Sequence, residues 1–139
     1  MIDFIVGYFI IYISICLHEV LHVICAKLFK IPLVKIQIGI DWLQISIGKL
    51  VISPIVGTSF VEVETEKLQE APRKIKILFF LSGALGNTVL TILFGILFFC
   101  IDKTIFAIAA AINIIIIISS LIPFGNTDMG TLRNLLEAE

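Results

Sequence analysis

The sequence predicts an all-α integral membrane fold of three transmembrane helices, with a small β hairpin or sheet at the membrane edge between the first two. The chain has 139 residues, 59% of them hydrophobic, and a mean hydropathy of +1.12, which is far more apolar than a soluble domain needs. Its apolar residues gather in three long runs, and a segment with a period of two follows the first run. Because little sequence remains for a separate soluble core, we expect a single membrane-embedded domain over residues 1–139.

The first apolar run, residues 2–29, predicts a helix that crosses the bilayer. At about 1.5 Å per residue it would reach about 42 Å, against a hydrocarbon core of about 30 Å. The run has no basic segment before it and no small-residue cleavage site after it. We therefore expect a retained transmembrane helix and not a signal peptide.

Two further apolar runs, residues 75–100 and 104–121, predict the second and third transmembrane helices. The polar pair Asp102 and Lys103 separates them. Such a short polar break between long apolar runs is typical of a tight turn at the membrane surface.

The segment of residues 33–64 differs from the three runs because its polar and apolar residues alternate. The alternating positions are Lys35, Ile36, Gln37, Ile38, Gly39, Ile40, Asp41 and Trp42, continued by Leu43, Ile45 and Ile47. A period of two indicates extended chain. Since open sheet edges are not tolerated against lipid, we expect these strands to pair with one another or to line a wet cavity.

The charges of the chain indicate its orientation and exclude one class of partner. Its net charge is −1, and most of its basic residues lie between Lys27 and Lys76, where they alternate with acids. This is no nucleic-acid footprint. The positive-inside rule predicts a multi-pass cell-membrane protein with residues 30–74 and the C-terminus in the cytoplasm and the N-terminus outside.

Both histidines of the chain fall in one short motif, His18-Glu19-Val20-Leu21-His22, inside the first apolar run. A carboxylate at the centre of a membrane helix costs about 3 kcal/mol, so Glu19 needs a functional reason. Residues four apart project from one helical face, so His18 and His22 could bind one tetrahedral Zn²⁺ beside Glu19. Zinc lowers the pKa of its bound water to about 7, and a glutamate can then carry the proton to a leaving amine. The motif predicts hydrolytic zinc chemistry.

A catalytic zinc commonly has three protein ligands, so one more is expected. Asp128 is the candidate, because it follows the third helix and returns to the membrane side of the histidines after the helix is interrupted at residues 123–127. Cys25 is the rival ligand, since it lies seven residues after His18 on the same face. Its alternative role is that of a buried small apolar residue.

Two further motifs follow the one at residues 18–22: Ser-Gly-Ala-Leu-Gly-Asn at residues 82–87 and Ser-Leu-Ile-Pro-Phe-Gly-Asn-Thr-Asp-Met at residues 120–129. Together the three motifs resemble the site-2 protease family (M50) of intramembrane zinc metalloproteases, whose patterns for the last two are Gly-Pro-x-x-Asn and Asn-x-x-Pro-x-Pro-x-x-Asp-Gly. The matching positions of the last two are Gly83, Asn87, Pro123 and Asp128, and the departures are Ala84, Ser120, Gly125 and Met129. The resemblance implies a catalytic role for Asn87 in transition-state stabilisation. It also implies that the β segment engages substrate as an added strand.

The expected activity is therefore hydrolysis of peptide bonds in membrane-embedded or membrane-associated peptides near the cytoplasmic face. His18, His22 and Asp128 would hold Zn²⁺, while Glu19 and Asn87 would act in catalysis. A bacterial plasma membrane is expected from the family's occurrence, and regulation is expected from a membrane partner or from substrate supply. Two alternatives stay open: a non-proteolytic zinc-binding membrane protein, and a silent scaffold that binds membrane peptides.

Two polar residues in the helices have simpler interpretations. Asn113, in the third run, is expected to form a hydrogen bond between helices, with nothing tying it to the site. Ser14 lies one turn before His18, but serines in helices commonly bond their own backbone. Neither is predicted to be a site residue.

Overall fold

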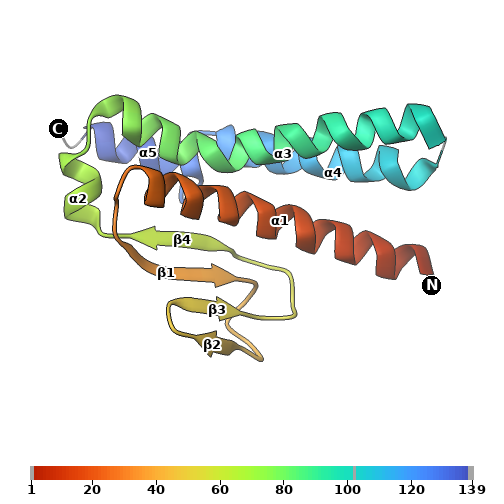
Figure 1. Cartoon of the computed structure of the whole chain (residues 1–139), viewed down its shortest axis with the longest axis horizontal. Coiled ribbons are helices and arrows are strands. Elements are labelled where there is room, and N and C mark those ends of the chain that lie inside the picture. The colour runs from red at the N-terminus through yellow and green to blue at the C-terminus, as the bar shows by residue number, and fades with distance from the viewer. Residues whose placement is uncertain (1, 102, 138–139) are drawn as a thin grey trace.

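Three long helices form the body of the protein in a computed structural model that describes residues 2–101 and 103–137. They are α1 (Ile2–Leu28), α3 (Arg73–Ile101) and α4 (Thr104–Leu121), and they run along the long axis of the molecule (Figure 1). By length and composition, each could cross a membrane. The three predicted helices are confirmed, and their bounds lie within two residues of those expected. Asp102, in the predicted turn, lies outside the described residues.

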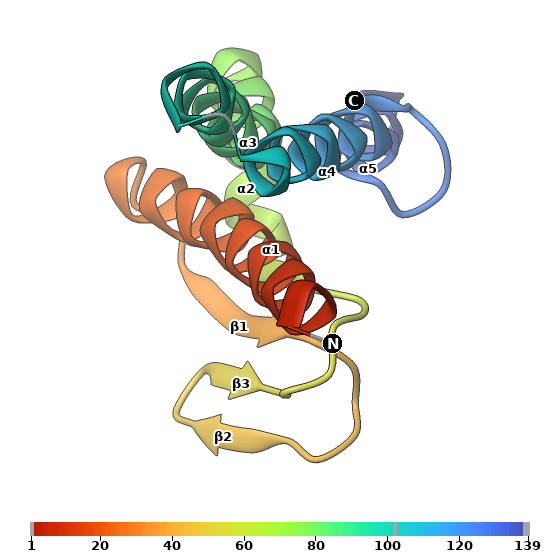
Figure 2. The ribbon, with the colours of Figure 1, turned by 90° about the vertical axis from the view of Figure 1, so that its right-hand side faces the viewer.

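The three helices pack as a triangular bundle when seen end-on (Figure 2). Small residues allow α1 and α3 to approach closely: a Cβ built on Gly86 would lie 2.8 Å from Leu21 Cδ1. Close packing through small residues is typical of helices in a bilayer. Large apolar side chains such as Phe9, Phe99 and Ile115 point outward and are exposed, so the bundle presents an apolar surface along its length.

A four-stranded sheet lies beside α1, on the opposite side from α3 (Figures 1 and 2). Its strands are β1 (Leu33–Ile38), β2 (Ile45–Ile47), β3 (Leu50–Ile52) and β4 (Phe60–Val63). The order is β2-β3-β1-β4, with β1 parallel to β3 and antiparallel to β4. The predicted small sheet is confirmed, and β4 lies at one of its edges.

The expectation of continuous extended chain through Trp42 was wrong. The first strand ends at Ile38, and the chain bends over residues 39–44. Gly39 has φ +87° and Leu43 has φ +53°, a left-handed conformation that turns the chain away from a strand. The bend brings the chain back to form β2 and β3.

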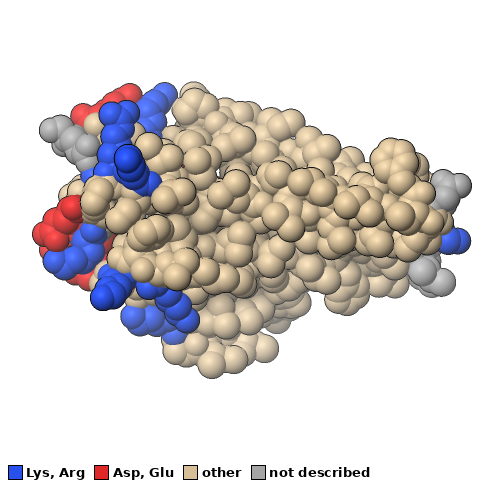
Figure 3. Space-filling view, turned by 45° about the horizontal axis from the view of Figure 1, so that its top comes forward, with Lys and Arg blue, Asp and Glu red and all other residues tan. Residues whose placement is uncertain are grey.

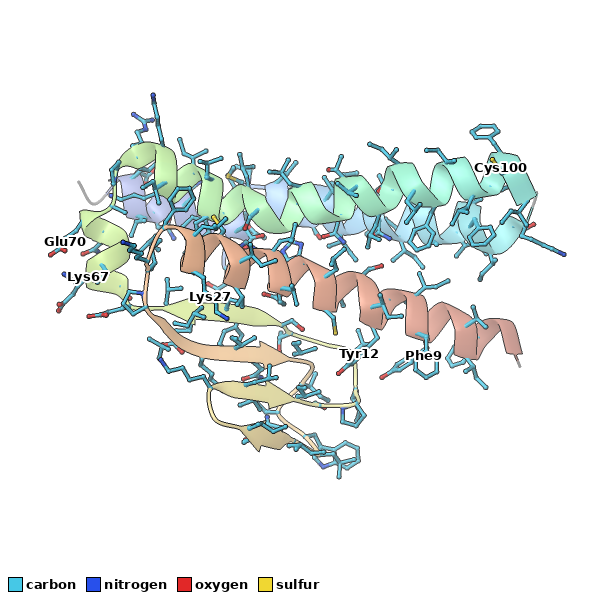
Figure 4. The ribbon with its side chains drawn as sticks, viewed as in Figure 1. Phe9, Tyr12, Lys27, Lys67, Glu70 and Cys100 are labelled. Atoms are coloured by element: carbon cyan, nitrogen blue, oxygen red, sulfur yellow. The ribbon has the colours of Figure 1, made fainter. Side chains whose placement is uncertain are left out.

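The loop before β4 is tied to the helix that carries the histidines. Tyr12 Oη donates a hydrogen bond to Ser53 O at 2.9 Å, and Tyr8 Oη donates one to Pro54 O. Figure 4 shows Tyr12 on the face of α1 that turns toward this loop. These contacts hold the sheet and α1 together.

Two short helices were not predicted from the sequence. They are α2 (Thr65–Glu70), before α3, and α5 (Asp128–Glu137), after α4. Between α4 and α5 the chain turns at Gly125, whose φ is +61°. Thr127 Oγ1 then accepts a hydrogen bond from Gly130 N at 3.0 Å and caps the new helix. The turn and the cap fix the direction in which α5 begins.

Charged side chains gather at one end of the molecule, where α1 ends and α3 begins (Figure 3). Between the two ends, the surface in this view shows almost no Lys, Arg, Asp or Glu. This end also carries α2, in which Lys67 pairs with Glu70 at 2.9 Å. The charge distribution of the molecule is therefore polarised along the helix axes.

Candidate active site

The centre of the site is formed by three residues of α1. His18, Glu19 and His22 are 8%, 5% and 3% exposed. The histidines project from one face of the helix because they are four residues apart, and their ring centroids lie 5.0 Å apart. Polar groups buried in an apolar helix need partners, and the rest of the fold supplies them for the two histidines.

Asp128 reaches the histidines from the first residue of α5. Its Oδ2 lies 3.1 Å from His18 Nε2 and 3.6 Å from His22 Nε2. Burial alone would raise the pKa of this carboxyl group, but the hydrogen bonds and charges of the two histidines outweigh burial and lower the pKa to about 2. Asp128 is therefore ionised at neutral pH, the form in which a carboxylate binds a metal.

The three ligand atoms have the spacing of a tetrahedral metal site. The two Nε2 atoms are 3.2 Å apart, which completes a triangle with the two distances to Asp128 Oδ2. Ligands at about 2.0 to 2.1 Å from a tetrahedral zinc lie about 3.3 Å from one another. Among the described residues, His18, His22 and Asp128 form a group that could hold one metal ion.

The outer nitrogens of both rings are held by oxygen atoms of α3. His22 Nδ1 lies 2.8 Å from Phe79 O, and His18 Nδ1 lies 2.6 Å from Asn87 Oδ1. Histidines that bind metals characteristically donate their second N–H to an oxygen in this way. Each ring is thereby oriented with Nε2 toward Asp128.

Gly83 of α3 makes room for this cluster. A Cβ at this position would lie 2.4 Å from His18 Nε2 and 2.5 Å from His22 Nε2. Any side chain here would occupy the space onto which the ligand atoms converge. The sequence singled out Gly83 only as part of a motif, and its steric role becomes visible once α3 is seen to pass directly over the two rings.

Glu19 lines a cavity of about 450 Å³ beside the histidines. The cavity is walled by residues of α1, α3 and α4, by Asn126 to Asp128 and Thr131, and by residues 57–61, which lead into and form β4. The polar residues Ser119, Ser120 and Thr127 also line it. The cavity therefore joins the carboxylate, the ligand group and the edge strand in one space.

The other residues considered from the sequence lie outside the ligand group. Cys25 is buried in the hydrophobic core with Phe79 and Phe80, as its simpler interpretation predicts. Asn87 is completely buried and bonded to His18, and it is not among the residues that line the cavity. A direct catalytic role for Asn87 stays a prediction.

Comparison with known proteins adds one family. A family model described as Peptidase family M50 matches residues 6–103, which is more than half of the chain and includes the histidine motif, Gly83 and Asn87. Searches of curated proteins and of solved structures found no match. The matched range ends before Asp128, so the assignment of this residue depends on the geometry of the site.

Proposed function

Because the chain belongs to peptidase family M50, the site-2 protease family, whose members are metal-dependent proteases, we propose that it is an intramembrane zinc metalloprotease. In this proposal the whole chain is one catalytic core. It hydrolyses peptide bonds of membrane-embedded or membrane-associated peptides near the cytoplasmic face. The observation that carries the proposal is the convergence of His18 Nε2, His22 Nε2 and Asp128 Oδ2 at 3.1 to 3.6 Å beside the buried Glu19.

The chemistry of each side chain indicates its proposed role, as a metal ligand or as a proton carrier. His18, His22 and Asp128 would hold Zn²⁺, and a bound zinc supplies an acidified water and polarises the carbonyl under attack. Glu19 takes the proton of the attacking water and delivers it to the leaving amine. Asn87 supports the reaction through its bond to His18. Burial of the cluster strengthens each of these electrostatic interactions.

The edge strand β4 is the proposed docking site for substrate. Residues 57–61 wall the cavity, and β4 is an edge strand that pairs with β1. A substrate segment added to this edge would be unwound, with its backbone hydrogen bonds satisfied by the protein. This arrangement would present an extended peptide bond to the site, as hydrolysis requires.

The proposed location is a cell membrane, with the charged end of the molecule in the cytoplasm. Three apolar helices of sufficient length support membrane insertion. The concentration of Lys and Arg at the end shown in Figure 3 supports this orientation by the positive-inside rule. We extend the proposal to a bacterial plasma membrane.

Metal content and peptide cleavage test the proposal together. The purified protein, resupplied with zinc, should hold about one Zn²⁺ per chain, and His22→Ala and Asp128→Ala should lower this content. Glu19→Gln should keep the metal and lose cleavage of a model transmembrane peptide. Glu66→Gln, at an exposed position of α2, is the matched control and should change neither property.

The outcomes separate the three functional classes. A wild type that binds no zinc would favour the peptide-binding scaffold. A wild type that binds zinc but cleaves no peptide, with a Glu19→Gln variant indistinguishable from it, would favour the non-proteolytic zinc protein.

A further inference from the structure

A line of buried polar side chains connects all three long helices behind His18. It consists of His18 and Ser14 on α1, Asn87 on α3 and Asn113 on α4. Both asparagines are 0% exposed. Buried amides in an apolar bundle are costly unless every polar atom is bonded. Only one order of donors and acceptors along this line of side chains gives every hydrogen bond a donor and an acceptor.

The order of donors and acceptors is fixed first by a backbone carbonyl of α4. Asn113 Nδ2 lies 2.9 Å from Ala109 O and 3.0 Å from Ser14 Oγ. A carbonyl oxygen can only accept, so the amide nitrogen of Asn113 must face Ala109. Its oxygen then faces Asn87 Nδ2 at 2.8 Å.

The same logic fixes Asn87 and then His18. Asn87 Nδ2 donates to Asn113 Oδ1 and to Ser14 O at 3.3 Å. Asn87 Oδ1 is therefore turned toward His18 Nδ1, at 2.6 Å. An amide oxygen can only accept, so His18 Nδ1 carries the proton and Nε2 keeps its lone pair for the site.

We propose that Asn113 is a positioning residue that, together with the backbone carbonyl of Ser14, sets the tautomer of His18 by fixing which end of the Asn87 amide faces the ring. The inference rests on the metal site of the proposed function and extends it to a residue of α4. A simple bond between helices could run in either direction, whereas here only one direction leaves the lone pair of His18 facing Asp128.

Loss of Asn113 should weaken this constraint. Without its oxygen, one N–H of Asn87 loses its acceptor, and the longer bond to Ser14 O, at 3.3 Å, is left to hold the amide against turning its nitrogen toward the ring. If Nδ2 faces His18, Nδ1 of the ring must become the acceptor and the proton moves to Nε2. The ring then competes with a proton for the atom that should bind the metal.

The test is zinc affinity of the full-length protein in detergent, measured by competition with a chromophoric chelator. Asn113→Leu should weaken zinc binding by about 10-fold, the low end of the 10- to 100-fold cost of losing a hydrogen bond made directly to a metal ligand, because Asn113 acts on His18 through Asn87. Thr88→Val is the control on α3, because its hydroxyl bonds Ala84 O of its own helix. It should change the affinity less than about twofold.

A double variant distinguishes positioning from packing. In Asn87→Asp, both side-chain oxygens accept, so the proton of His18 stays on Nδ1 whatever occupies position 113. Adding Asn87→Asp to Asn113→Leu should therefore restore most of the lost affinity. A packing defect at position 113 would not be repaired by this change.

Imidazole nitrogen NMR provides a readout that needs no variant, since the chain has only two histidines. In the zinc-loaded wild type both Nδ1 atoms should carry a proton, and an unprotonated Nδ1 on His18 would overturn the proposal even if Asn113→Leu did not fold. Unchanged affinity in Asn113→Leu would also overturn it, as would absence of zinc binding by the wild type. A weakened Asn113→Leu variant of a protein that cleaves no peptide would support the positioning role while the proposed protease function failed.

Discussion

The two histidines of the site lie one helical turn apart, yet the regions of α3 that support them are of different kinds. His22 is held by a backbone carbonyl, Phe79 O. His18 is held by a side-chain amide, Asn87, which is itself oriented by a second amide. A backbone carbonyl is present whatever residue occupies the position, whereas an amide can be lost by one substitution. The site should therefore tolerate changes behind His22 and be sensitive to changes behind His18.

The largest effect is expected from Gly83→Ala, because the added methyl group would reach both histidine rings at once. The added methyl group would lie about as close to one Nε2 as to the other. Zinc affinity should fall by more than about 100-fold, beyond the usual range for outer groups of a metal site. Chelator competition measures the loss.

Gly95→Ala is the matched control for this change. Gly95 lies on the same helix, and a Cβ there would meet nothing within 4 Å. The variant should bind zinc like the wild type. Equal affinities for the two glycine variants would show that α3 does not limit the space at the metal.

A smaller effect is expected from Asn87→Leu, which removes a hydrogen bond from His18 and leaves the one to His22 in place. Zinc affinity should fall by about 10- to 100-fold, because Nδ1 loses its acceptor while His22 keeps its own. Thr91→Val, which removes a hydroxyl bonded to Asn87 O, serves as the control. An Asn87→Leu variant with wild-type affinity would remove the distinction between the two rings.

The smallest effect is expected from Ser82→Ala, on the side of His22. Ser82 Oγ lies 3.1 Å from His22 Nδ1 but also donates to Phe79 O at 2.6 Å. Because the carbonyl remains after the substitution, zinc affinity should change by no more than about threefold. A loss as large as that of Asn87→Leu would mean that the hydroxyl, and not the backbone, holds this ring.

The sequence predicted the helices and the local part of the site because both depend on short-range spacing. His18, Glu19 and His22 lie together through the period of one helix. The position of Asp128 could be expected from the predicted topology, in which three transmembrane helices separate it from the N-terminus. Topology alone could not place Asp128 next to the histidines. Its exact position depends on the turn at Gly125 and the cap at Thr127, which set the direction of α5.

Other features depend on packing between distant segments and could not be predicted in the same way. The parallel pairing of β1 with β3 requires the chain to bend over residues 39–44. The alternation of polar and apolar residues continues through this bend, so the pattern gives no sign of it. The roles of Gly83 and Phe79 O depend on where α3 crosses α1. Asn113 was expected to bond between helices, which it does, but the direction of that bond follows only from its neighbours.

The position of Asp128 also bears on the biosynthesis of the protein. This residue lies 110 positions after His18 and follows all three long helices. A ribosome completes the histidine pair early, but the carboxylate emerges only after the third helix has been made. If the chain is the metalloprotease proposed above, its metal centre would stay incomplete, and the protein inactive, until the segment after the third long helix has been made.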